Sequence, residues 1–204
     1  IGSSAGLVNT ASGNVFIGSL CGRTNTSGSE QCFVGYKAGN LATGAANTIV
    51  GGSAGDFFTT GTNNCLFGAN AGGAAAATTM SNCAFFGKDT GLLNTANENT
   101  FIGSLCGNAN VEGTRLVYIG YNAGGTAAAA TDNDNTAVGY SALAAANGSA
   151  SGNNVAIGSN ALLLQTTGIQ NTVVGAQAGR TLLAVSNLTL VGYNAGTLAT
   201  VAET

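Results

Sequence analysis

The sequence predicts an all-β fold, a parallel β-solenoid (β-roll) of about twelve coils of 16–19 residues, on three observations. A glycine preceded by a large apolar residue recurs along the whole chain. Its period is too short for helical-hairpin repeats, which need roughly 33 residues or more. The chain has 33 glycines and no proline, and proline cannot donate the hydrogen bonds that interior strands need. Residues 1–204 are therefore predicted to be one repeat domain, with two short strands and two turns in each coil.

We call the recurring glycine the anchor, and its surroundings follow the pattern N-[T/V/C]-x-[I/V/F]-G-x-x-A-G. Examples are NVFIGSLCG from Asn14, NTAVGYSAL from Asn135 and NTVVGAQAG from Asn171. The anchors are Gly2, Gly18, Gly35, Gly51, Gly68, Gly87, Gly103, Gly120, Gly139, Gly158, Gly175 and Gly192. Because the first unit starts in its middle and the last lacks a polar cap, we expect a fragment of a longer fibre chain.

The residue directly before the anchor is the predicted core of the first strand, since it is always Ile, Val or Phe and would stack from coil to coil. These residues are Ile17, Val34, Val50, Phe67, Phe86, Ile102, Ile119, Val138, Ile157, Val174 and Val191. A small residue, usually alanine, stands three positions after the anchor. It is predicted to lie on the second strand or at its corner, where a small side chain allows neighbouring segments of the chain to approach closely.

An asparagine stands four positions before most anchors, at the predicted start of the strand. These are Asn14, Asn47, Asn64, Asn99, Asn135, Asn154 and Asn171. Amide side chains in register can hydrogen-bond along such a stack, so a structural ladder is the favoured interpretation, and sugar binding is the alternative. Asn82 and Asn187 stand one residue earlier, which leaves room for bulges in these two strands.

The composition argues against an enzyme. Gly51 to Gly55 match the G-x-S-x-G elbow of serine hydrolases, but the chain has no histidine to activate Ser53. The position of Ser53 is filled by Lys37 and Gln177 in other units, so the match follows from the repeat. We predict no catalytic, cofactor or metal site. Thr131 to Asn135 (TDNDN) lack the spacing of calcium β-rolls.

The charge balance and the apolar runs bear on possible partners. Five Lys and Arg against eight acids predict no nucleic-acid partner. No apolar run is long enough to insert in a membrane.

The five cysteines fit positions of the repeat rather than a disulfide framework. Cys21 and Cys106 stand three after an anchor, and Cys32 and Cys65 stand three before one. We expect them to be small buried hydrophobes. Cys65 and Cys83 both follow an asparagine on adjacent coils, so they are the one intrachain pair that could form a disulfide, and the sequence leaves this open.

NTAVGYSAL, NVAIGSNAL and NTVVGAQAG resemble the head repeats of YadA-type trimeric autotransporter adhesins. They are even more similar to the N-T-A-[VI]-G-x-x-A-[LG] repeats of phage and large-virus tail or surface fibres. The resemblance covers essentially the whole chain. It implies a β-roll of three chains side by side, a homotrimer, that projects from a virion or a bacterial surface. The implied function is a structural and adhesive fibre segment, extracellular, that supports attachment to a host cell surface through a glycan or protein receptor.

A second interpretation is a monomeric solenoid that binds ice or self-assembles into an extracellular filament or sheath. Its basis is threonine three positions before the anchor, at Thr48, Thr100, Thr136, Thr172 and Thr189. Cysteine and valine interrupt the series.

The position two before each anchor gives the predicted trimer interface. In a lone solenoid this side chain would point outward, opposite the predicted core residue, and yet it is apolar in every coil. The interface is therefore predicted through Phe16, Phe33, Ile49, Leu66, Phe85, Phe101 and Tyr118. From Ala137 to Val173, smaller residues would draw the chains closer together.

Overall fold

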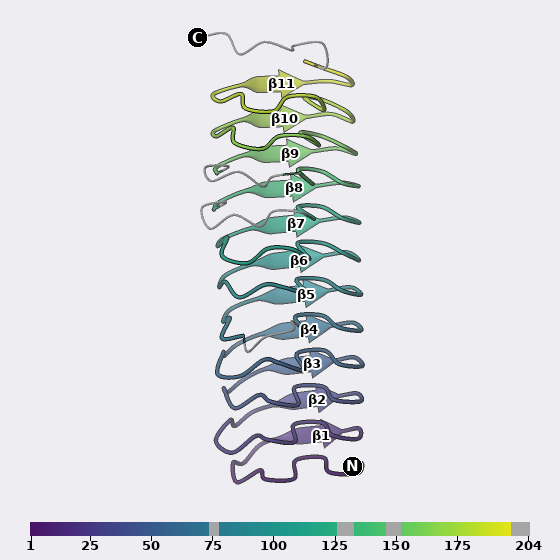
Figure 1. Cartoon of the computed structure of the whole chain (residues 1–204), viewed down its shortest axis with the longest axis vertical. Helices are drawn as coiled ribbons and strands as arrows, with labels where there is room; N and C mark the ends of the chain where they lie inside the picture. The colour runs from purple at the N-terminus through teal and green to yellow at the C-terminus, as the bar shows by residue number, and fades with distance from the viewer. Residues whose placement is uncertain (74–77, 126–132, 146–151, 197–204) are drawn as a thin grey trace.

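The computed structural model describes residues 1–73, 78–125, 133–145 and 152–196. Eleven three-residue strands stack in chain order into one parallel sheet, so the chain is an all-β parallel solenoid, as predicted (Figure 1). The strands are β1 (Val15–Ile17), β2 (Cys32–Val34), β3 (Thr48–Val50), β4 (Cys65–Phe67), β5 (Ala84–Phe86), β6 (Thr100–Ile102), β7 (Val117–Ile119), β8 (Thr136–Val138), β9 (Val155–Ile157), β10 (Thr172–Val174) and β11 (Thr189–Val191).

Each coil has one regular strand, and the predicted second strand is wrong for the described residues. The strand ends at the anchor glycine, whose φ is +133° at Gly103. A Cβ atom on Gly103 would lie 2.5 Å from the carbonyl oxygen of Gly120 in the next coil. The chain then makes a tight turn in which Cys106 N–H donates to the Gly103 carbonyl. The small residues three after the anchor lie buried at this corner, as at Ala38 and Ala123.

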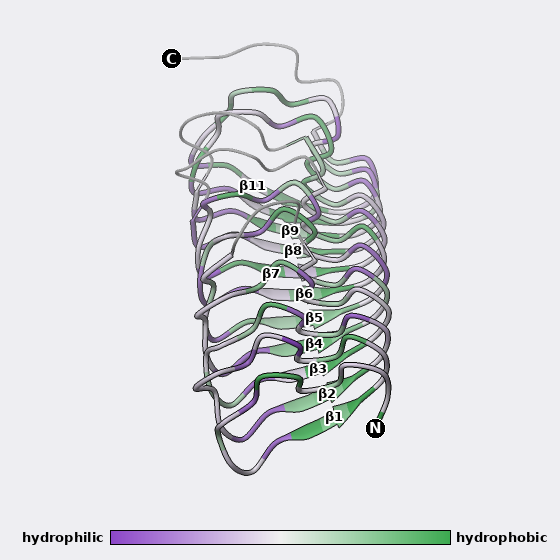
Figure 2. Cartoon of the chain, turned by 60° about the horizontal axis from the view of Figure 1, so that its bottom comes forward, coloured by the Kyte–Doolittle hydropathy of each residue, from purple (hydrophilic) through white to green (hydrophobic). Residues whose placement is uncertain are grey.

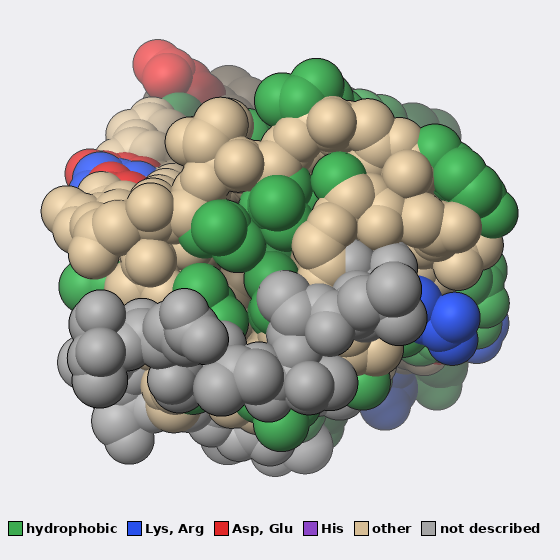
Figure 3. All heavy atoms as spheres, turned by 90° about the horizontal axis from the view of Figure 1, so that it is seen from above, with side chains coloured by type: hydrophobic (Ala, Val, Ile, Leu, Met, Phe, Trp, Pro, Cys, Tyr) green, Lys and Arg blue, Asp and Glu red, His purple; other side chains and the backbone are tan. Residues whose placement is uncertain are grey.

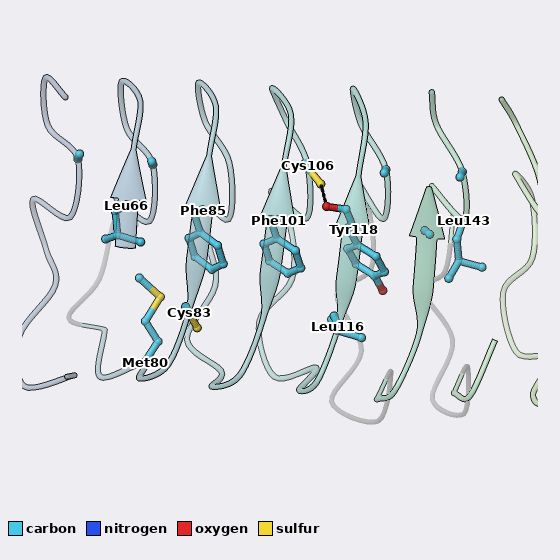
Figure 4. Close-up of a cluster of buried hydrophobic side chains, with 14 of the residues drawn as sticks. Leu66, Met80, Cys83, Phe85, Phe101, Cys106, Leu116, Tyr118 and Leu143 are labelled. Carbon is cyan, nitrogen blue, oxygen red and sulfur yellow. Dashed lines mark hydrogen bonds between the residues drawn. The ribbon is translucent and has the colours of Figure 1, made fainter. Parts of the chain in front are cut away.

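The core lies on the opposite side of the strand from the side that the sequence predicted. The residue two before the anchor, which we call the inner column, points into the solenoid (Figure 4). Its members Phe33, Ile49, Leu66, Phe85, Phe101, Tyr118, Ala137, Ala156 and Val173 are fully buried, and Phe16 and Leu190 are partly buried at the two ends. Successive side chains of a strand alternate between faces, so the residues directly before the anchors point outward.

This orientation makes the predicted trimer interface wrong. Phe16, Phe33, Ile49, Leu66, Phe85, Phe101 and Tyr118 already pack against one another within a single chain, so they cannot face a neighbouring chain. The rings of Phe85 and Phe101 stack with centroids 4.8 Å apart, and those of Phe101 and Tyr118 stack at 5.2 Å. A sequence of apolar residues on both faces of the strand does not itself say which face is inside. The homotrimer as such stays a prediction.

The small residues of the inner column do not draw chains together, because leucines of the same coil fill the space. Four positions after the anchor, ten of twelve coils have glycine. A Cβ at Gly107 would lie 2.5 Å from the Phe101 ring, so a ring in the inner column requires glycine there. In the coils of Ala137 and Ala156 this position is Leu143 or Leu162, and both leucines are fully buried.

The asparagines form the predicted ladder, and their burial excludes the sugar-binding alternative for all but the terminal, half-buried Asn14. The Asn99 amide donates to the Gly113 carbonyl at 2.8 Å, and its oxygen accepts from Leu116 N–H at 3.0 Å, both in the next coil. The Asn171 amide donates to the Asn154 oxygen at 3.0 Å. Each of these asparagines therefore joins two coils through hydrogen bonds that are shielded from solvent.

The predicted bulges at Asn82 and Asn187 are wrong. β4 pairs with β5, and β10 with β11, residue for residue. Cys83 and Leu188 occupy the ladder position. The two asparagines stand one residue earlier, where the backbone of every described coil has positive φ, and both have a φ of 59°.

Candidate functional site

The outward side of the sheet is a continuous surface along the eleven strands of the described chain. It consists of the residues one and three before each anchor, and we call it the outer face. The residues one before are the eleven that the sequence had assigned to the core, from Ile17 to Val191. The residues three before are Val15, Cys32, Thr48, Cys65, Ala84, Thr100, Val117, Thr136, Val155, Thr172 and Thr189. None of the 22 is buried and none is charged, and five are threonines, so the outer face is a mostly apolar strip along the rod. The strands are mostly green or white in Figure 2.

Two of the largest side chains of the outer face are adjacent. The rings of Phe67 and Phe86 stack with centroids 5.0 Å apart and an interplanar angle of 3°. Phe86 is 39% exposed and Ile17 is 43% exposed, which are high values for large apolar side chains in regular strands. The two phenylalanines share their strands with the small residues Cys65 and Ala84.

A polar column borders the outer face where each strand begins. In nine of the eleven coils the residue five before the anchor is polar and exposed: Glu30, Asn63, Asn82, Glu98, Arg115, Asp134, Asn153, Gln170 and Asn187. Gly13 and Ala46 stand there in the other two. Within this column, Arg115 makes a two-pronged contact with Asp134 of the next coil, with Nε–Oδ1 at 2.6 Å and Nη2–Oδ2 at 2.9 Å. This pairing lowers the pKa of Asp134 and raises that of Arg115. We call this column the rim.

The remaining ion pairs lie on the other side of the strand, after the anchor. Lys88 lies 2.6 Å from Asp89, which also accepts a hydrogen bond from Asn70 of the preceding coil at 2.8 Å. The bond from Lys88, and then that from Asn70, hold the pKa of Asp89 below its usual value. Lys37 lies 3.6 Å from the buried Asp56. Seen from above, charged side chains occupy only small parts of the visible perimeter, and several hydrophobic ones lie near the visible centre (Figure 3). The Lys37–Asp56 pair and the Asn70–Asp89 bond connect coils, whereas Lys88 and Asp89 are neighbours within one coil.

Ser53 lies in the turn after its anchor with a φ of 54°, a backbone conformation that the same position has in all twelve units. Its local geometry therefore belongs to the repeat rather than to a nucleophile elbow. Among the described residues, no three His, Cys, Asp or Glu side chains gather as a metal site. The calcium alternative at TDNDN involves Thr131 and Asp132, which lie outside the described residues. No helix in the described ranges is long and apolar enough to cross a membrane.

The cysteines divide between the interior and the outer face. Cys21, Cys83 and Cys106 are buried, and burial raises the pKa of the first two to about 11 and that of Cys106 to about 12. The Cys106 thiol donates to the Tyr118 carbonyl (Figure 4). Cys32 and Cys65 lie on the outer face and are partly exposed, so the prediction that they are buried is wrong. All five are free, and the Cys65–Cys83 disulfide is absent because the two residues occupy opposite faces of the sheet.

Four tyrosines follow anchors directly and are exposed: Tyr36, Tyr121, Tyr140 and Tyr193. The rings of Tyr121 and Tyr140 stack on adjacent coils with centroids 5.5 Å apart. The Lys37 ammonium lies 5.7 Å from the centroid of the Tyr36 ring. These side chains combine an apolar ring with a polar hydroxyl, which is typical of residues at binding surfaces.

Comparison of the chain with protein-family models, with curated proteins and with solved structures gave no match. The outer face and its rim are therefore the best candidate for a functional site on structural grounds. Sequence reasoning placed the residues one before each anchor in the core and did not single out the rim. The signal that could have found them is the threonine at five of the eleven positions three before the anchor, because Tyr118 is the single inner-column residue with a polar group.

Proposed function

We propose that the chain is a structural segment of an extracellular attachment fibre, either a viral tail or surface fibre or a cell-surface adhesin. In this role it holds a receptor-binding part away from the particle or cell, and copies stand side by side, as a homotrimer in the resemblance-based prediction. Its role is mechanical rather than catalytic. The exposed tyrosines are the side chains that would contact a glycan or protein receptor if this segment itself takes part in binding.

The observation that supports this proposal is the unbroken stack from β1 to β11. Each described strand pairs with the next in register, and ladder asparagines add side-chain hydrogen bonds between coils. Parallel strands lie about 4.8 Å apart, so the stack is a rod of about 50 Å with one continuous sheet. A repeat in which every coil supports its neighbours can vary in length without losing its fold. That property suits a spacer in a fibre.

The test is deletion of one whole unit, residues 158–174, which joins Ile157 to Gly175 and keeps the repeat in phase. We expect a folded rod shorter by about 4.8 Å, measured by small-angle scattering, with attachment to host cells unchanged. A matched deletion of residues 158–166 puts the repeat out of phase and should unfold the neighbouring coils. If the in-phase deletion leaves the rod intact but abolishes attachment, this segment binds the receptor and is no mere spacer.

One observation favours a second candidate, an ice-binding solenoid. The threonines at 48, 100, 136, 172 and 189 all lie on the outer face, which is a regular parallel sheet surface. The stacked rings of Phe67 and Phe86 and the valines and cysteines of the same columns interrupt that array, so this function ranks second. Thermal hysteresis in a solution of the purified chain would reverse the ranking.

A further inference from the structure

We propose that the outer face is the surface through which copies of this chain associate side by side, parallel and in register. The inference deepens the proposed function and rests on its side-by-side assembly. A chain that stayed monomeric would leave the spacer role untouched, so the two proposals can fail separately. The occupant that we propose for the outer face is a second copy of the same face.

The area of the outer face is the first argument. Its 22 side chains are all at least partly exposed, and at about 50 Å² each they present about 1,000 Å² of mostly apolar surface. Soluble monomers rarely expose a contiguous apolar patch above a few hundred Å², whereas a stable interface needs about 800 Å² from each partner. The outer face is thus large enough for a stable interface and too large to be an ordinary monomer surface.

The distribution of charge is the second argument. The outer face has no charged residue over eleven strands, while the rim beside it contains Glu30, Glu98, Arg115 and Asp134. An apolar centre with a polar border is the usual anatomy of a protein interface. The strip runs without interruption from β1 to β11, so a small globular partner would cover only part of it. A second copy has the same length and the same spacing between strands.

The sizes of the side chains specify the orientation of the copies. If two rods are related by a two-fold rotation about an axis parallel to them, the residue one before the anchor on one chain faces the residue three before the anchor on the other, at the same strand. This pairing gives a dimer, in place of the threefold assembly of the resemblance-based prediction. Phe67 would then face Cys65 of the other copy, and Phe86 would face Ala84. Antiparallel rods would instead place like columns opposite each other, and the two phenylalanines would meet Val138 and Ile119. The parallel arrangement pairs the largest side chains with much smaller ones, which favours close packing.

The first experiment compares two double variants with the same added charge in the same two coils. Ile157→Lys/Val174→Lys alters the outer face, and Asn153→Lys/Gln170→Lys alters the rim. Sedimentation equilibrium between 1 and 100 µM should show oligomers for the wild type and the rim variant, and a shift to monomer, with at least tenfold weaker association, for the face variant. Circular dichroism should show the same fold in all three. A wild-type monomer at 100 µM, or a folded face variant that associates like the wild type, would overturn the proposal.

The second experiment uses the native cysteines and needs no variant. Cys32 and Cys65 lie on the outer face, while Cys21, Cys83 and Cys106 are buried within the chain and serve as the internal control. Maleimide labelling of the first two should slow at least several-fold as the chain is concentrated, with the other three unlabelled throughout. Equal labelling rates in the monomer and the oligomer would contradict the outer face as the interface.

Cross-linking then tests the orientation. A bismaleimide of about 13 Å span can join equivalent cysteines across two sheets about 10 Å apart. Parallel, in-register copies should give Cys32–Cys32 and Cys65–Cys65 links, identified by peptide mass spectrometry. Cys32–Cys65 links between chains, or complete modification of both cysteines in the oligomer without a link between like residues, would overturn the parallel register.

Discussion

The two faces of the sheet are made of similar residues but have different roles. The inner column and the outer face both consist largely of apolar residues, and adjacent residues such as Phe101 and Ile102 belong to opposite faces. Phe101 is fully buried, while Ile102 is 40% exposed. The inner column therefore contributes to the stability of one chain, whereas the outer face can contribute only when something covers it. Apolar character alone does not distinguish a core from an interface.

The largest expected effect comes from comparing these two neighbours directly. Phe101→Ala removes a ring stacked between Phe85 and Tyr118 and should lower the free energy of unfolding by about 3–5 kcal/mol. Ile102→Ala should lower it by about 1 kcal/mol or less. Both are measured by urea denaturation at a concentration at which the chain is monomeric. Equal losses would mean that the inward and outward faces are assigned the wrong way round.

A smaller effect tests the position at which each strand ends. Gly51 has a φ of +146°, and a Cβ there would overlap the Gly68 carbonyl of the next coil. Gly51→Ala should destabilise the chain by about 2–4 kcal/mol, through backbone strain and overpacking. At the neighbouring Gly52, a Cβ atom would have no other atom within 4 Å. Gly52→Ala should change stability by less than about 0.5 kcal/mol, as followed by thermal unfolding. A tolerated Gly51→Ala would show that the anchor is dispensable.

The repeat made the architecture predictable. The anchor spacing, the absence of proline and the asparagine ladder follow from requirements that every coil shares, namely a tight turn, paired strands and satisfied amides. The extra residues of the longer coils do not disturb this, because they lie outside the stretch from the ladder asparagine to the turn. Strand pairing consequently stays in register from β4 to β5, where the anchors are 19 residues apart.

The direction of the side chains was not predictable in the same way. Because side chains alternate along a strand, choosing the wrong apolar position reverses every residue at once, and this moved both the core and the predicted interface. The polar content of the neighbouring column decides between the alternatives. On the outer face, Thr48 and Thr100 have hydroxyls that fit a surface exposed to water. In the inner column, the neighbouring Phe33 and Ile49 have no polar group. The burial of Cys32 and Cys65 was predicted wrongly for the same reason, because the position three before the anchor lies on the outer face.

The final prediction concerns how two positions of one coil share the space behind the sheet. A ring in the inner column accompanies glycine four after the anchor, as in Phe101 and Gly107, whereas Ala137 accompanies the buried Leu143. Ala137→Phe alone should clash with Leu143 and cost about 1–3 kcal/mol. Leu143→Gly alone should leave a cavity and cost about 2–4 kcal/mol, a loss reduced because Leu143 has a φ of 52° that glycine adopts more readily.

The double variant Ala137→Phe/Leu143→Gly recreates the combination found in the ring-containing coils. We expect it to be within about 1 kcal/mol of the wild type, because the new ring fills the space that the leucine leaves. The double-mutant cycle should therefore give a favourable coupling energy of at least about 2 kcal/mol, as for residues in direct contact. Denaturant unfolding of the four proteins supplies the cycle. Additive losses would show that the two positions do not share one space, and that the small residues of the inner column must be explained by something outside the single chain.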